Sequence, residues 1–215
     1  MIPKHIGFIM DGNGRWAQSH GLPREKGYIE GLRALKTVAN ECARLGISAI
    51  SVYALSTENL ARPQSELDAI FKVVENFNLS YDGNFVVRYM GDCSLLPENV
   101  KRSVDFVEEK TKNNGGMILN IALGYGAQAD IVNAAKLTGE NCSAEEFEKH
   151  LSTAGLPPLD LVVRTGGEKR LSNFLLYELA YAELIFLDDK WPDMDENKVD
   201  ECIAEFEGRK RKFGK

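Results

Sequence analysis

The stretch Ile6-Gly7-Phe8-Ile9-Met10-Asp11-Gly12-Asn13-Gly14-Arg15 joins a short apolar run to a glycine-rich polar turn. The apolar half is typical of a buried β-strand. In the polar half, Asp11 directly follows the strand and suits Mg²⁺, two glycines let the backbone approach a ligand, and a beginning helix offers free N–H groups to an anion. Asp-Gly and Asn-Gly also mark hairpin turns. The following residues, 15–20, do not alternate like a returning strand, so the pattern favours a ligand-binding turn.

Further short apolar or β-branched runs predict five more strands, at residues 47–53, 85–89, 117–122, 161–163 and 184–186. Longer amphipathic stretches predict helices between most of them, for example at residues 29–45, 65–79 and 97–112. Strands that alternate with helices imply parallel neighbours joined by crossovers. We therefore predict an α/β fold with a mainly parallel six-stranded sheet flanked by helices on both faces. Residues 1–215 should form a single domain, with a loose excursion at residues 136–158.

The polar, glycine-rich segments of the chain come directly after predicted strands. They are Asp11–Arg15, Ser56–Asn59, Gly91–Asp92, Gly124–Gly126 and Arg164–Glu168. In an open parallel sheet, ligands bind beyond the carboxyl ends of the strands. We expect these segments to share one rim of the sheet and to form the functional site there.

The segment Arg164-Thr165-Gly166-Gly167-Glu168-Lys169-Arg170-Leu171-Ser172-Asn173 places two arginines and a serine around a flexible turn, before a helix expected near Ser172. Arginine suits phosphate because its planar fork binds two oxygens at once. Taken alone, the segment is equally consistent with an N-capped helix that carries surface charges. A second anion site opposite it, at Asp11–Arg15, favours binding.

Other polar residues allow two interpretations each. Ser56-Thr57-Glu58-Asn59 could cap the following helix, contribute to the rim, or do both. Glu183, in an apolar run, is either an exposed helix residue or a metal ligand. The segment Asp188–Asp193 is predicted to be a loop anchored by its tryptophan, because Pro192 would break a helix. The three histidines have no metal spacing, so we interpret them as structural or solvated.

The composition limits the partners. The net charge of −6 and the pI near 5.2 argue against a broad nucleic-acid surface. The four cysteines lack the spacing of a zinc or redox site, and the most apolar segment, Phe174–Leu187, is too short to cross a bilayer. We expect a cytoplasmic protein, with peripheral contact to a membrane left open. The basic tail Arg209–Lys212 is either a solvated helix end or a contact to an anion or a second subunit.

Nearly the whole chain resembles the cis-prenyltransferases of the undecaprenyl diphosphate synthase family. Five blocks in the same order carry the resemblance: Lys4–Ala17, Tyr53–Asn59 with Arg62-Pro63, Leu119–Ala122, Arg164–Glu168 with Arg170–Phe174, and Tyr181–Leu184 with Trp191–Asp193.

The resemblance implies a homodimeric enzyme that extends an allylic diphosphate, typically farnesyl diphosphate, by isopentenyl diphosphate with a new cis double bond. It implies that Asp11 and Glu183 hold Mg²⁺ and that Asn59 takes part in removing the proton. For the allylic diphosphate it implies Gly12, Asn13, Gly14, Arg15 and Arg24. For isopentenyl diphosphate it implies Arg164, Arg170 and Ser172, with Leu171 beside them. The residues that line or support the site would be Trp16, Tyr28, Ser56, Thr57, Glu58, Leu60 and Arg62.

The chain departs from the family pattern at several of these positions. Tyr28 stands where a histidine is usual, and Leu60 where a tryptophan is common. The segment between Pro63 and Gly91 is shorter than in long-chain members, which suggests a shorter product tunnel. The alternatives to a long-chain, undecaprenyl-type synthase are a short-chain or irregular prenyl synthase and a non-catalytic partner subunit. The presence of Asp11 and of the diphosphate arginines argues against the last.

Overall fold

The computed structural model describes residues 2–209, and all six predicted strands form one parallel sheet in the order β3-β4-β2-β1-β5-β6. The strands are β1 (His5–Ile9), β2 (Ala49–Ser56), β3 (Val86–Met90), β4 (Ile118–Tyr125), β5 (Leu161–Arg164) and β6 (Glu183–Phe186). The α-helices are α1 (Asn13–Ser19), α2 (Arg24–Arg44), α3 (Gln64–Ser80), α4 (Glu98–Thr111), α5 (Ala127–Leu137), α6 (Ala144–Glu148) and α7 (Glu196–Gly208). The short 3-10 helices are η1 (Glu58–Ala61), η2 (Cys93–Leu95), η3 (Glu178–Tyr181) and η4 (Trp191–Asp193). The predicted parallel sheet is confirmed.

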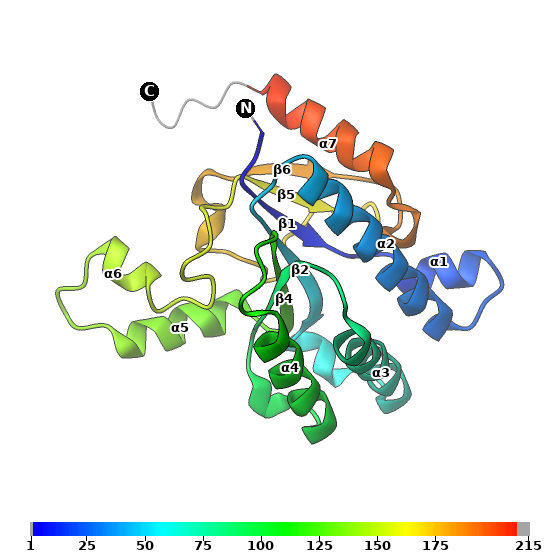
Figure 1. Cartoon of the computed structure of the whole chain (residues 1–215), viewed down its shortest axis with the longest axis horizontal. Helices are drawn as coiled ribbons and strands as arrows, with labels where there is room; N and C mark the ends of the chain where they lie inside the picture. Colours follow the sequence, from blue (N-terminus) through cyan, green and yellow to red (C-terminus); the bar gives the residue numbers. More distant parts are fainter. Residues whose placement is uncertain (1, 210–215) are drawn as a thin grey trace.

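Four helices cover one face of the sheet (Figure 1). Alternate strand residues such as Phe8 and Val52 pack there against apolar residues of α2, α3, α4 and α7, for example Val38 and Ile203. A separate apolar cluster, which includes Leu55 and Val74, joins the ends of β2 and β4 to α3 and α4. Burial of this apolar surface is the main source of stability of such a layered fold.

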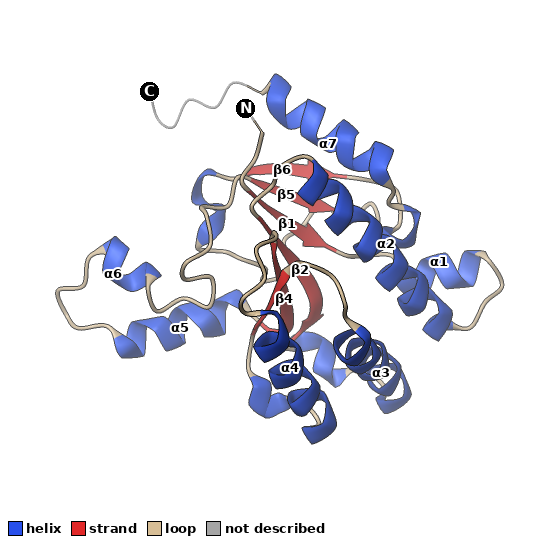
Figure 2. Cartoon of the chain, in the orientation of Figure 1, coloured by secondary structure: helices blue, strands red, loops and turns tan. Residues whose placement is uncertain are grey.

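The opposite face is covered by the beginning of α5 and by the segment that follows β5 (Figure 2). Strand residues of the other set, such as Ile9 and Tyr53, contact Phe174 and Leu175 of that segment. The rings of Tyr53 and Phe174 are stacked, with their centroids 4.6 Å apart. The helix predicted to begin near Ser172 is absent from this segment of the described chain, which runs through turns instead.

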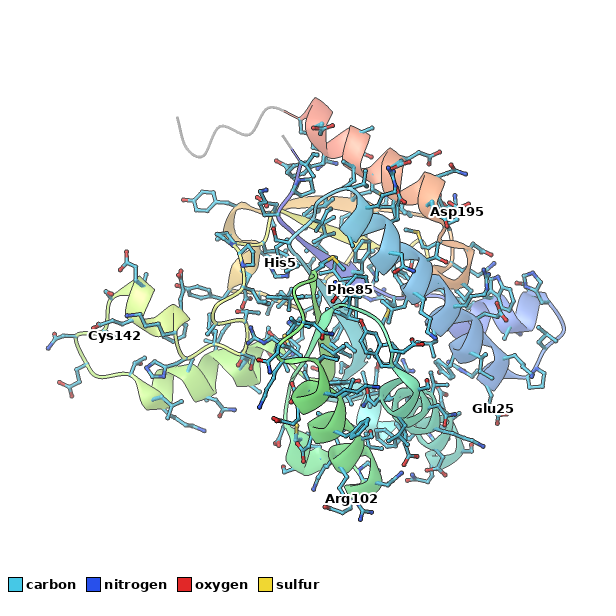
Figure 3. All side chains as sticks on the ribbon, viewed as in Figure 1. His5, Glu25, Phe85, Arg102, Cys142 and Asp195 are labelled. Carbon is cyan, nitrogen blue, oxygen red and sulfur yellow. The ribbon has the colours of Figure 1, made fainter. Side chains whose placement is uncertain are left out.

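The excursion predicted at residues 136–158 leaves the sheet with the end of α5 and carries α6. Cys142 lies at its periphery, whereas His5 lies in the centre of the molecule (Figure 3). A true capping box begins α6, because Ser143 and Glu146 each accept the other's backbone N–H. The carboxylate of Asp130 in α5 holds the returning chain by accepting the Ser152 hydroxyl at 2.7 Å.

The predicted loop Asp188–Asp193 is anchored by Trp191, as expected, and its last three residues form η4. Trp191 is 1% exposed, and its indole N–H donates to the carbonyl of Gly31 in α2 at 2.8 Å. Its ring packs on Phe8, with the centroids 5.8 Å apart. Trp191 thus fixes the chain after β6 against β1 and α2.

His5 is structural, which is one of the two interpretations given for the histidines. Its ring lies between the hydroxyl of Ser51, at 2.8 Å, and the carbonyl of Pro157, at 2.9 Å. Asn120 on β4 donates to the same hydroxyl at 3.0 Å, so a buried polar row crosses three neighbouring strands. Burial lowers the pKa of His5 from 6.5 to about 4, against the opposing effects of the Pro157 carbonyl and of Asp160.

Candidate active site

The carboxyl ends of β1 and β5 bring Asp11 and Arg164 together. The two strands are paired so that Ile9 lies opposite Arg164, and Asp11 follows two residues later. One carboxylate oxygen of Asp11 accepts the guanidinium of Arg15 at 2.9 Å, and the other accepts that of Arg164 at 3.0 Å. Burial would raise the pKa of the Asp11 carboxyl, but the hydrogen bonds from Arg164 and Arg15 outweigh it and hold the pKa below its usual value. Asp11 is therefore an anion at neutral pH.

The backbone around Asp11 is fixed from two sides. Its carbonyl accepts the hydroxyl of Thr165 at 2.8 Å and the N–H of Trp191 at 2.9 Å. Arg15 also donates to the carbonyl of Gly166 at 2.8 Å. Gly166 has φ 89°, and a β-carbon there would lie 2.6 Å from the Arg15 guanidinium. A glycine is therefore required for this close approach of the two loops.

Arg164 links Asp11 to a second polar loop. Its guanidinium donates to the Ser172 hydroxyl at 2.9 Å and to the carbonyl of Arg170. Its side chain is only 4% exposed, and within residues 2–209 its Nε atom is buried without a hydrogen-bond partner. A buried donor without a partner is costly, and a ligand oxygen at this place would satisfy it.

Ser172 reaches Arg164 because the loop takes a left-handed conformation. Ser172 has φ 50° and Asn173 has φ 63°. The Asn173 side chain stabilises this conformation by donating to Glu58 at 3.0 Å and accepting the N–H of Gln128 at 2.9 Å. The phenol of Tyr53 donates to the Ser172 carbonyl at 3.2 Å. The loop is thus held by residues that follow β2 and β4.

These groups open into one cavity of about 360 Å³. Its polar mouth is lined by Asp11, Gly12, Asn13, Gly14, Arg15, Arg24, Tyr28, Ser56, Asn59, Arg62, Arg164, Arg170 and Ser172. Its apolar interior is lined by residues of α2, α3 and the sheet, among them Leu32, Leu35, Val52, Leu55, Ile70, Val74, Phe77 and Ile121. The cavity therefore suits a ligand with an anionic head and an apolar tail.

Charge in the mouth is strongly one-sided. Five arginines and a single carboxylate line the cavity, in a chain whose net charge is −6. Local placement of arginine thus creates a cationic site on an acidic protein. Asn13 supports the arrangement: its amide donates to the Met10 carbonyl at 3.0 Å, while its own carbonyl oxygen is buried without a partner among the described residues.

Several residues predicted for the site do not line this cavity. The Trp16 indole turns to the Asp193 carboxylate, at 2.7 Å, and stacks on His20. Glu58 contacts the second loop through Asn173, and Thr57 donates to Glu58 at 3.1 Å. Leu60 packs against the apolar cluster of α3 and α4. The Leu171 carbonyl accepts the N–H of Phe174 at 3.1 Å, within the turn.

Glu183 lies at the opposite edge of the sheet. It is the first residue of β6 and pairs with Leu161, the first residue of β5, whereas Arg164 is the last. Arg164 follows Leu161 by three residues, so Glu183 lies about 10 Å along the strand direction from the level of Arg164. Its carboxylate accepts Arg209 at 2.8 Å. Within residues 2–209 of one chain, Glu183 and Asp11 therefore lie apart, and the assignment of Glu183 to the metal stays a prediction. No group of three or more metal-ligating side chains occurs within those residues.

Three residues that shape the site were not predicted for it from the sequence: Thr165, Asn173 and Glu66. Thr165 was visible as the residue after Arg164, and Glu66 as an acid four residues after Arg62, a spacing that pairs side chains on a helix. Asn173 lies where the sequence predicts a helix, and the described chain runs through turns there instead. Of the basic tail, only Arg209 lies within the described residues, where it also contacts Glu205 at 2.5 Å.

The fold and the site define a parallel α/β protein with a cavity that suits anionic ligands with an apolar part. The sequence model of the family described as "Putative undecaprenyl diphosphate synthase" matches residues 9–214. An isoprenyl transferase of Oceanobacillus iheyensis is 40% identical over 228 residues, which cover 99% of this chain and 90% of the relative. A ditrans,polycis-undecaprenyl-diphosphate synthase of Micrococcus luteus, described as specific for (2E,6E)-farnesyl diphosphate, is 38% identical and covered to 92%.

Two solved structures agree with this assignment. Lavandulyl diphosphate synthase from Lavandula x intermedia, in complex with dimethylallyl diphosphate, has a TM-score of 0.95 at 30% identity, over 100% of this chain and 99% of that one. A "probable undecaprenyl diphosphate synthase" from Campylobacter jejuni has a TM-score of 0.83 at 33% identity, over 99% of both chains. The chain belongs to the undecaprenyl diphosphate synthase family and is a prenyltransferase.

Proposed function

We propose that this protein condenses isopentenyl diphosphate with an allylic diphosphate, with farnesyl diphosphate as the primer, to give a cis-polyprenyl diphosphate. The observation that supports this most is the pair of arginine-rich loops that meet at Asp11 above an apolar cavity. The glycine-rich turn with Arg15, Arg24 and Arg62 would hold the allylic diphosphate. Arg164, Arg170 and Ser172 would hold isopentenyl diphosphate.

The reaction breaks the allylic C–O bond, and the diphosphate leaves with the electron pair. The double bond of isopentenyl diphosphate then forms the new C–C bond, and a proton is lost. Fixed arginines stabilise the departing charge, and two aligned substrates lower the entropic part of the barrier. Asn59 lines the mouth and is fixed by its backbone N–H, which donates to the Ser56 hydroxyl at 3.1 Å, so we assign it to the proton-removal step.

Asp11 also fits a Mg²⁺ site. Mg²⁺ is typically held by one or two carboxylates together with substrate phosphate oxygens, and it would neutralise charge on the departing diphosphate. Asp11 is ionised, lines the cavity and has a side chain that is 28% exposed. Both of its oxygens contact arginines in this structure, so at least one arginine would turn to the diphosphate when Asp11 takes a metal.

We further propose that residues 1–215 act as one domain, that the enzyme is a cytoplasmic homodimer, and that it contacts a membrane only through its lipid product. All six strands belong to one sheet, which supports the first point. Among residues 2–209, no helix is both long and apolar enough to cross a bilayer.

A short-chain or irregular prenyl diphosphate synthase is the second candidate. Two observations favour it: the TM-score of 0.95 with lavandulyl diphosphate synthase, and a cavity of about 360 Å³. That volume lies at the lower end of the range for small-molecule sites, which is roughly 300–1,000 Å³.

The test is to incubate the purified protein and Mg²⁺ with labelled isopentenyl diphosphate and either dimethylallyl or farnesyl diphosphate, and to measure product chain length. Long products from farnesyl diphosphate support the first candidate. Single condensations, or products from dimethylallyl diphosphate alone, support the second. If folded protein forms no product with either primer, the proposed activity is wrong.

A further inference from the structure

One carboxylate oxygen of Glu66 in α3 contacts three side chains that line the mouth of the cavity. That oxygen accepts the Tyr28 phenol at 2.5 Å and the Arg62 guanidinium at 2.9 Å, and it lies 3.4 Å from the guanidinium of Arg24. The Glu66 side chain is only 11% exposed. Because water reaches the carboxylate poorly, its attraction for the arginines is weakly screened.

Arg24 and Arg62 are also two of the arginines assigned to the allylic diphosphate. Both line the cavity, and Arg24 lies so close to the glycine-rich turn that a β-carbon on Gly14 would be 2.7 Å from its Nε atom. Without a ligand, the Glu66 carboxylate partly neutralises the positive charge of Arg24 and Arg62. A diphosphate in the mouth would therefore compete with Glu66 for the same two guanidinium groups.

Tyr28 is placed to decide this competition. Its ring packs against the apolar cluster that includes Leu55 and Ile70, so the phenol is held in position. Burial, followed by the hydrogen bond to Glu66, raises the pKa of the phenol, so Tyr28 remains a donor throughout the neutral range. Unlike the arginines, it carries no charge that a diphosphate would attract.

We propose that Glu66 is an internal counter-ion that the allylic diphosphate displaces from Arg24 and Arg62, and that Tyr28 is the positioning residue that makes this displacement easy. The phenol stays on the Glu66 carboxylate and keeps it hydrogen-bonded after the arginines have turned to the diphosphate. The inference rests on the proposed function, because it assumes that this mouth binds a diphosphate. It assigns to Tyr28 a role through Glu66 rather than direct contact with phosphate.

The test measures binding of inorganic diphosphate by titration calorimetry, at fixed salt, to the wild type, Tyr28→Phe, Glu66→Gln and the double variant. Tyr28→Phe leaves the carboxylate dependent on the arginines, so we expect binding about threefold to tenfold weaker. Glu66→Gln removes the competing charge, so we expect binding tighter by a similar factor, about threefold to tenfold. In the Glu66→Gln background, the further change Tyr28→Phe should have little effect.

The kinetic readout separates this role from a structural one. Tyr28→Phe should raise KM for the allylic substrate while kcat and KM for isopentenyl diphosphate stay near the wild-type values. Tyr177 is a matched control, because its phenol faces the Glu148 carboxylate at 3.4 Å on the exposed surface near α6. Tyr177→Phe should bind diphosphate like the wild type. If Glu66→Gln does not fold, Glu66→Asp can replace it. Its side chain is one methylene shorter, so the carboxylate lies farther from the arginines, and we expect diphosphate to bind more tightly, but to a smaller degree.

Three results would overturn the inference. If both single variants weaken binding, Glu66 only supports the arginines and does not compete. If neither changes binding, the network has no influence on the ligand. If the folded wild type does not bind inorganic diphosphate at all, the proposed function fails together with the inference, which distinguishes that failure from the first two.

Discussion

At the scale of single residues, the site depends on side chains that hold other side chains in position through hydrogen bonds. Asn173 shows this best, since its amide joins the loops after β2 and β4 while its backbone stays left-handed at φ 63°. Asparagine tolerates that conformation better than most residues. The result is that Ser172 faces Arg164, which in turn faces Asp11.

Asn173→Ala should therefore affect stability and one substrate in particular. Loss of both side-chain hydrogen bonds and a strained alanine should lower the free energy of unfolding by about 1–3 kcal/mol, measured by urea denaturation. KM for isopentenyl diphosphate should rise more than KM for the allylic substrate, since Ser172 belongs to that half of the site. Asn141→Ala, at an exposed turn residue, is the control. Equal changes in both KM values would contradict this role of Asn173.

His5 gives a prediction about pH. Its pKa is about 4 in the folded protein and near 6.5 when unfolded, so between these values the unfolded chain binds the extra proton. The contribution of neutral His5 to the free energy of unfolding is fully present above pH 6.5. It is lost as the pH falls toward 4, and the loss is about 3 kcal/mol at most. The measurement is the difference in unfolding free energy between the wild type and His5→Gln at several pH values, which cancels the contributions of the carboxylates. A difference that does not change between pH 7 and pH 4.5 would refute the assignment.

At the scale of secondary-structure elements, the sequence predicted the strands well and the loops poorly. The apolar runs are long enough to be unambiguous, and the residues after them did meet at one rim. The turn at Ser172 could not be predicted, because its left-handed residues depend on contacts with Tyr53 and Gln128, which are distant in sequence. Glu183 directly precedes a predicted strand, so the rule for parallel sheets places it away from the carboxyl-end rim within one chain.

The free edge of β3 is protected by α4. The outward N–H of Val87 donates to the Thr111 hydroxyl at 3.0 Å, and that of Tyr89 donates to Glu108 at 2.7 Å. Edge strands with free N–H groups invite pairing with another chain. The side chains of α4 therefore satisfy the edge without a seventh strand.

Thr111→Val tests this edge. The variant keeps the shape but leaves the buried N–H of Val87 without an acceptor, which should cost about 1–3 kcal/mol of unfolding free energy. Thr138→Val is the matched control, because the Thr138 hydroxyl donates to the nearby Ala135 carbonyl, at 3.1 Å, at the end of α5. Urea denaturation compares them. If the two variants are equally stable, the Thr111 hydroxyl contributes nothing to the edge.

At the scale of the whole molecule, the strand order brings distant parts of the chain to one place. β1 lies between β2 and β5, so a turn near residue 11 meets loops near residues 59 and 164. Because all six strands run parallel, their carboxyl ends share a rim, and the helices α2 and α3 enclose an apolar cavity beneath it. Two loops that carry arginines thus lie above a single apolar cavity.

Asp11 joins the two halves of this site, and the variant Asp11→Asn tests this role. The measurement is the rate of incorporation of labelled isopentenyl diphosphate into product from farnesyl diphosphate with Mg²⁺, for the wild type and the variant. Asparagine keeps the size but loses the charge that orients two arginines and suits a metal. We predict elongation by the wild type and a rate at least about 100-fold lower for the folded variant. A variant that elongates as fast as the wild type would contradict this role of Asp11.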